Sequence, residues 1–167
     1  MKYARKSVLI LIAASAFSVA YAQIVPAGGH SRAQNREEAV TYLFPEQVTI
    51  AAGKPSPVAL HFRVAQGLHI NSHTPSDDSL IPTVFSVPAE SGVHLEAANY
   101  PAGTEMTLSV DPNTKLNVYT GDFVIETRLL ATPGDHLVQG KLRYQACDQE
   151  KCMPPKTITV PIDVIGK

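Results

Sequence analysis

The chain has 167 residues, of which 14 are Lys or Arg, 15 are Asp or Glu and two are Cys. A formal net charge of -1 excludes the strongly basic surface of nucleic-acid binding proteins, so no nucleic-acid partner is expected. Thirteen Pro, ten Gly and no Trp favour short strands and turns over a helical bundle, and the length fits one domain.

The first 22 residues have the order of a secretory signal, with a basic start, an apolar run over residues 8–20 and Ala20-Tyr21-Ala22 as a cleavage site. We therefore expect export and cleavage before Gln23. The apolar run is shorter than the about 20 residues that span a bilayer, so no stable membrane insertion is expected. Removing this signal takes away three basic and no acidic residues, which changes the net charge from -1 to -4.

Residues 23–39 are polar and small and have no hydrophobic period, which predicts a flexible lead-in before a single domain at residues 40–167. The first strand signal covers residues 40–44 and 48–50 and is split by Pro45. In the clearest strand, alternation places four apolar side chains on one face, namely Val58, Leu60, Phe62 and Val64.

Further strands are predicted at residues 83–87, 93–96, 106–110 and 123–130, with turn formers such as Asp111-Pro112-Asn113 between them. Strands that recur about every 8 to 12 residues indicate an all-β fold and favour a β-sandwich. No window longer than two turns keeps a helical apolar period, so no helix is expected after the signal.

The last two strands flank both cysteines. Even-numbered residues from Val138 to Ala146 form one apolar face, which puts Cys147 on the opposite, polar side. A final amphipathic strand then points Ile158, Val160, Ile162 and Val164 inward. The cysteine pair is therefore predicted to lie in a polar, reachable loop at the mouth of a hairpin-like unit.

Four residues separate Cys147 from Cys152, so the loop can bring their Cα atoms within the about 7 Å that a disulfide needs. Closing so small a ring contributes only about 2 kcal/mol, which is little for a structural crosslink. A reachable sulfur with a second thiol beside it is also what thiol-disulfide exchange requires. The residues leave open two alternatives, a purely structural disulfide and a metal site that uses Met153 and histidines.

The stretch YQACDQEKCMPPKTITVPIDV at residues 144–164 resembles the N-terminal periplasmic domain of the protein-disulfide reductase DsbD family. The resemblance rests on Tyr-Gln-x-Cys, a short insert, Cys-x-Pro-Pro and a closing strand rich in Thr and Val. Residues 67–71, 75–82 and 118–122 also resemble segments of that family. The resemblance implies an immunoglobulin-like β-sandwich in the periplasm.

The resemblance further implies that Cys147 and Cys152 are a redox pair that relays electrons to or from thioredoxin-like periplasmic proteins. An enzymatic activity, if the chain has one, would be of the protein-disulfide reductase type, with no cofactor and no metal. The family's cap loop matches residues 115–121, where Val118 or Tyr119 would cover the sulfurs. Because the chain carries no membrane-spanning or Cys-x-x-Cys domain of its own, a separate membrane electron donor is expected.

Three further side chains receive a structural interpretation. His69 and His73 lie near a predicted turn and are expected to be solvated rather than metal-binding. Tyr144 is an even-numbered residue of its strand and so lies on the apolar face. It is therefore assigned to the core, where it would at most help to position the cysteines without contacting a partner.

Overall fold

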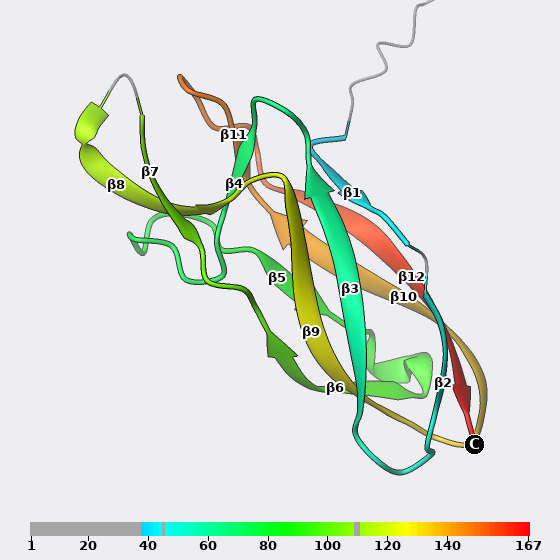
Figure 1. Cartoon of the computed structure of the whole chain (residues 1–167). Helices are drawn as coiled ribbons and strands as arrows, with labels where there is room; N and C mark the ends of the chain where they lie inside the picture. Colours follow the sequence, from blue (N-terminus) through cyan, green and yellow to red (C-terminus); the bar gives the residue numbers. More distant parts are fainter. Residues whose placement is uncertain (1–37, 45, 109–110) are drawn as a thin grey trace, which may run out of the picture. The chain divides into compact units, whose positions relative to one another are not determined.

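A computed structural model describes residues 38–44, 46–108 and 111–167 (Figure 1). The predicted signal, its cleavage site before Gln23 and nearly all of the predicted lead-in lie outside these residues. The domain boundary at residue 40 stays a prediction. The regular secondary structure of the described part consists of strands and one short 3-10 helix, η1 (Ala89–Ser91), which confirms the all-β prediction. It contains no helix long and apolar enough to cross a membrane.

Two four-stranded sheets form a sandwich (Figure 1). The strand order of the first sheet is β1 (Val40–Tyr42), β3 (Ser56–Val64), β9 (Asp122–Ala131) and β6 (Val93–Asn99). That of the second is β2 (Glu46–Ile50), β12 (Lys156–Gly166), β10 (Gly134–Tyr144) and β5 (Val84–Ser86). β1 pairs with β3 and β2 pairs with β12, so the chain changes sheet between Tyr42 and Glu46. This change explains why the first strand signal is split.

The core lies between the two sheets and follows the predicted alternation. The inward residues of β3 and β12 are all buried, namely Val58, Leu60, Phe62, Val64, Ile158, Val160, Ile162 and Val164. Phe123 on β9 stacks on Phe62, with 5.2 Å between the ring centroids. Burying one such side chain contributes about 1.5–3 kcal/mol, so these alternating faces hold the sandwich together.

A third sheet extends from one end of the sandwich (Figure 1). It contains Cys147. Its strand order is β11 (Ala146–Cys147), β4 (His69–Asn71), β8 (Asp111–Tyr119) and β7 (Thr104–Leu108). The turn predicted at residues 111–113 and most of the loop predicted at 115–121 are therefore strand. Pairing with β7 and β4 stabilises β8 although its first half has no apolar alternation, so the sequence pattern gave no strand signal.

Candidate functional site

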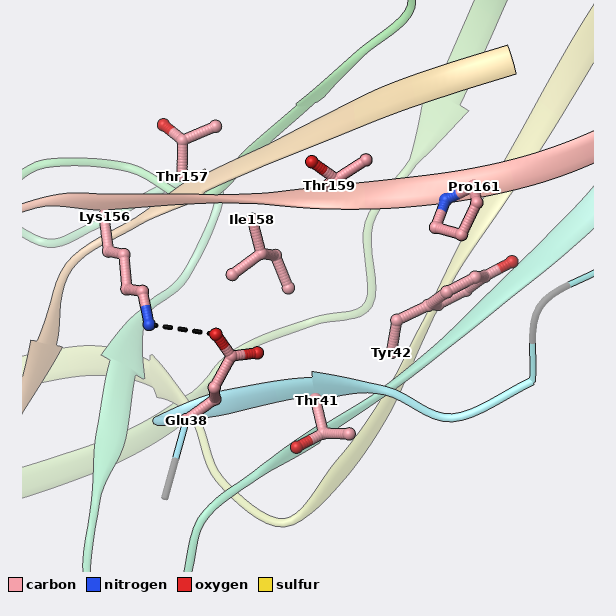
Figure 2. A pocket seen from close by; sticks show the side chains of 8 residues that line it. All are labelled: Glu38, Thr41, Tyr42, Lys156, Thr157, Ile158, Thr159 and Pro161. Atoms are coloured by element: carbon pink, nitrogen blue, oxygen red, sulfur yellow. Dashed lines mark hydrogen bonds and ion pairs between the residues drawn. The ribbon is translucent and has the colours of Figure 1, made fainter. Parts of the chain in front are cut away.

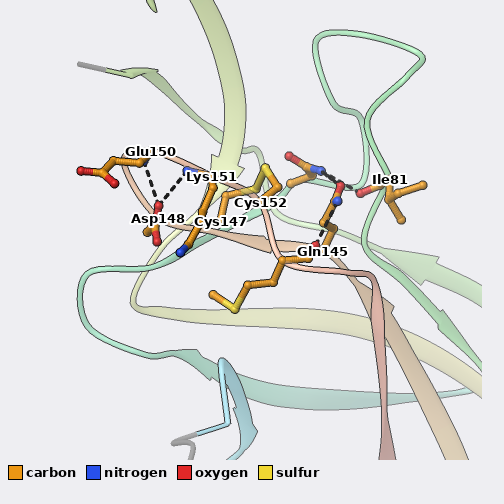
Figure 3. The surroundings of a disulfide bond; sticks show 9 residues. Ile81, Gln145, Cys147, Asp148, Glu150, Lys151 and Cys152 are labelled. Carbon is orange, nitrogen blue, oxygen red and sulfur yellow. Dashed lines mark hydrogen bonds between the residues drawn. A yellow bond between two sulfur atoms is a disulfide. The ribbon is translucent and has the colours of Figure 1, made fainter. Parts of the chain in front are cut away.

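A disulfide joins Cys147 to Cys152 in the excursion between β10 and β12, with 3.9 Å between the Cα atoms (Figure 3). The two residues face each other as an antiparallel bridge. Two backbone hydrogen bonds flank the bridge, from Met153 N–H to Ala146 C=O at 2.8 Å and from Asp148 N–H to Lys151 C=O at 2.9 Å. The excursion therefore folds back on itself as a tight hairpin, as its spacing predicts.

The two cysteines differ sharply in exposure. Cys147 is 1% exposed, whereas Cys152 is exposed. Cys147 lies between two neighbours, with His69 of β4 opposite it on one side and Cys152 on the other. The prediction that Cys147 lies on an accessible side is wrong, because parity fixes only the face of a strand and here both faces are covered. Cys152 is therefore the accessible residue of the pair.

The turn between the cysteines is fixed by the Asp148 carboxylate (Figure 3). Its Oδ1 atom accepts hydrogen bonds from the backbone N–H groups of Glu150 and Lys151, both at 2.8 Å. These two bonds lower the pKa of the Asp148 carboxyl, with smaller contributions from the charge of Lys151 and from His69 in its protonated form. The carboxylate is thus ionised at neutral pH and holds the short loop in one conformation.

Two side-chain amides, of Gln145 and Asn71, connect the segment just before β11 to the chain after Cys152 (Figure 3). Gln145 Nε2 donates to the Met153 carbonyl at 3.1 Å. The buried Asn71 Nδ2 donates to the Ile81 carbonyl at 3.0 Å and to Gln145 Oε1 at 3.4 Å. Sequence reasoning assigned no role to either amide, although Gln145 is part of the Tyr-Gln-x-Cys motif that carried the family resemblance.

His69 is 2% exposed, so the prediction of a solvated turn histidine is wrong for this residue. All three residues of β4 are buried, and β4 is an interior strand with β11 and β8 as its neighbours in the sheet. The His69 Nε2 atom is buried and has no hydrogen-bond partner. Burial lowers the pKa of His69, and the charge of Asp148 opposes that shift. His73 is exposed, as predicted, and stacks on Tyr100 with 3.7 Å between the ring centroids.

The three residues predicted to cover or support the cysteines are all buried. Val118 and Tyr119 lie on β8 and pair with Asn71 and Ile70, so β4 separates them from β11. The Tyr119 hydroxyl accepts the His73 N–H at 3.0 Å and donates to the Pro101 carbonyl at 3.1 Å. Tyr144 belongs to the core, where burial raises the pKa of its hydroxyl. Their covering and supporting roles stay predictions.

Two surface grooves differ in the residues that line them. One, of about 430 Å³, lies beside the cysteine turn, and its lining includes His69, Met106, Thr120 and Gln149. The other, of about 540 Å³, runs between β1 and the first half of β12 and is spanned by an ion pair of Glu38 and Lys156 at 3.2 Å (Figure 2). Neither thiol nor histidine lines this second groove. Across the described ranges, no group of three or more potential metal ligands was found.

The fold and the site define a β-sandwich domain in which an exposed cysteine is bonded to a buried one at the end of the sheets. The family model for the N-terminal region of the thiol:disulfide interchange protein DsbD matches residues 39–163. The chain belongs to this DsbD N-terminal domain family, which confirms the resemblance found in the sequence.

One solved structure similar to this chain is the DsbD N-terminal domain of Neisseria meningitidis in its reduced form. The two are 19% identical, with a TM-score of 0.47, and the match covers 69% of this chain and 82% of that one. Comparison with curated proteins gives no match.

Proposed function

We propose that this chain is a periplasmic thiol-disulfide exchange domain whose Cys147–Cys152 pair cycles between disulfide and dithiol. The observation that carries the proposal is the unequal exposure of the two bonded cysteines. A thiol of another protein can reach the Cys152 sulfur, whereas the Cys147 sulfur is placed to react only with Cys152. Membership of the DsbD N-terminal family supports the same function.

The exchange that this geometry favours has two steps. When the domain gives up electrons, the Cys152 thiolate attacks a disulfide of the partner, and a mixed disulfide with Cys152 forms. The Cys147 sulfur then attacks Cys152, closes the intramolecular disulfide, and releases the partner's sulfur as a thiolate. In the reverse direction, the same steps reduce the Cys147–Cys152 disulfide with electrons from the dithiol of a donor protein.

The proposed partners are thioredoxin-like periplasmic proteins, with a separate membrane protein as electron donor. Such a partner would approach the exposed turn around Cys152, which presents Gln149, Glu150 and Lys151 before it and Pro154 and Pro155 after it. The groove beside the turn adjoins this surface through Gln149. Val118 and Tyr119 remain our candidates for the cap that shields the pair.

Trapping of the mixed disulfide tests the proposal. Each single variant, Cys147→Ser and Cys152→Ser, is mixed with a thioredoxin-fold protein whose one active-site cysteine carries a thionitrobenzoate leaving group. We expect Cys147→Ser to form the covalent complex at least ten times faster than Cys152→Ser, as followed on non-reducing gels. The double variant Cys147→Ser/Cys152→Ser is the blank.

Equal rates for the two single variants, or no complex from either, would contradict the proposal. The reduction potential gives a second measurement. A structural disulfide has a potential below about -300 mV, whereas an exchange-active pair is more oxidising. A value below that limit would favour the alternative, a binding or assembly module with a purely structural disulfide.

A further inference from the structure

Three residues with reactive or titratable side chains lie in one row, two of them in the third sheet and the third, Cys152, in the bridge beside it. His69 of β4 is directly opposite Cys147 of β11, and Cys147 is directly opposite Cys152. Directly opposed residues of antiparallel strands point to the same face, with Cβ atoms about 4.5–5.5 Å apart. His69 is therefore the neighbour of Cys147 on the side away from Cys152.

The buried ring nitrogen of His69 has no hydrogen bond in the disulfide form. Buried polar atoms in proteins are nearly always hydrogen-bonded, so the placement of this nitrogen calls for an explanation. Reduction of the disulfide creates an S–H donor at the adjacent Cys147, where none exists in the oxidised form. The dithiol form thus offers the His69 nitrogen a partner.

The resolving step requires a base at this position. The thiolate is the nucleophile in thiol-disulfide exchange, and burial in protein raises the pKa of a thiol. Cys147 is 1% exposed, so bulk water is poorly placed to remove its proton. The neighbouring imidazole is the group that can do so.

We infer that His69 is the proton acceptor for the Cys147 thiol in the resolving step, an inference that rests on the exchange function proposed above. The S–H proton of Cys147 passes to the His69 nitrogen. The electron pair left on sulfur forms the bond to Cys152, and the bond between Cys152 and the partner breaks with its electron pair on the partner's sulfur. The imidazolium then returns its proton to solvent or to the released thiolate.

The charges around His69 are compatible with this role. The charge of Asp148 in the cysteine turn acts to raise the pKa of His69, which favours the imidazolium that proton transfer creates. The groove residues beside the ring, Leu68, Met106, Thr120 and Gln149, carry no charge. Lys151 acts on Asp148, and Lys115 pairs with Glu105 at 2.9 Å on the neighbouring hairpin. Because burial lowers the pKa of His69, the ring is neutral and able to accept a proton at pH 7.

The test uses the chromogenic disulfide DTNB, which needs no protein partner. DTNB reacts first with Cys152 of the reduced domain and releases one thionitrobenzoate; Cys147 then attacks Cys152 and releases the second. In the native domain we expect the rate of the second release to change little between pH 7 and pH 8, because His69 is already neutral. A native rate that instead rises tenfold per pH unit would overturn the inference.

The variants His69→Gln and His69→Leu remove the base, and His94→Gln, at an exposed position on β6, is the matched control. A thiol with a pKa of about 8.5 is only about 3% ionised at pH 7, so losing the base should slow the second release by about 30-fold or more. The rate should then rise tenfold per pH unit, while the first release stays as in the native domain. A second release at the native rate in both variants would refute a role for His69.

The two proposals fail in different ways. If the partner-trapping experiment succeeds and the His69 variants resolve normally, the exchange function stands and only the inference about His69 falls. If DTNB does not react with native Cys152 in preference to Cys147, the proposed function itself falls.

Discussion

Reduction of the disulfide is the most direct perturbation of this domain, and its cost in stability follows from the loop length. The two cysteines are separated by 5 positions, so the bond closes a very small ring. The chain-entropy relation gives about 2 kcal/mol for such a ring at 25 °C. A domain of this kind has a free energy of unfolding of about 5–15 kcal/mol, so the reduced form should remain folded. Urea unfolding with and without dithiothreitol measures the difference.

The surroundings of the disulfide point to the same result. The hydrogen bonds from Met153 N–H and Asp148 N–H that flank the bridge do not depend on the S–S bond. The long β10–β12 ladder runs from Gly134 opposite Gly166 to Tyr144 opposite Lys156 and is independent of it too. A loss of 4 kcal/mol or more, or loss of the cooperative transition, would refute this reasoning and indicate a structural bond.

Two further predictions concern the polar groups that position the cysteines. Asn71→Ala leaves the Ile81 carbonyl and the Gln145 side chain without their hydrogen-bond donor. This loss should lower the free energy of unfolding, measured in urea, by about 1–3 kcal/mol. If the effects of Asn71→Ala and Gln145→Ala simply add in the double variant, the two amides are not coupled and the reasoning is contradicted. The folded-state pKa of Asp148 lies below its unfolded value, so its stabilising contribution is present above about pH 4 and is lost as the pH falls through the folded pKa. Thermal melts from pH 6 to pH 2 should therefore show a smaller acid-induced loss for Asp148→Asn, whose amide oxygen still accepts the turn's N–H groups; identical pH profiles would refute this.

Most of the fold could be predicted from alternation alone. Strands β3, β10 and β12 each bury one face over many residues, so a two-residue period identifies both their type and their inward side. The location of the cysteines between β10 and β12 followed from the same pattern. The resemblance to the family could be found from the sequence because both motifs that carry it, Tyr-Gln-x-Cys and Cys-x-Pro-Pro, are short and contiguous.

The third sheet could be predicted only in part: the strand predicted at residues 106–110 overlaps β7, whereas β4 and β11 are defined by their neighbours. β4 has three residues and is buried on both faces, and β11 has two, so neither offers a period to detect. The burial of Cys147 and His69 arises from pairing between segments 78 positions apart. Asn71 and Gln145 are polar residues that sequence patterns assign to solvent, and only this pairing makes them a partly buried bridge.

The unequal exposure of the two cysteines has a local cause in the chain after Cys152. From the pair Tyr144–Lys156 to the pair Cys147–Cys152, two residues intervene on one side and three on the other, so the pairing shifts register by one residue. Two of the three are Pro154 and Pro155, which have no N–H to donate and cannot extend the β12 ladder. The chain therefore leaves the sheet before it reaches Cys152, while Cys147 stays paired with β4. Because the Pro-Pro pair ends the ladder on one side only, Cys152 is exposed while Cys147 stays buried, and this asymmetry is the basis of the exchange proposed above.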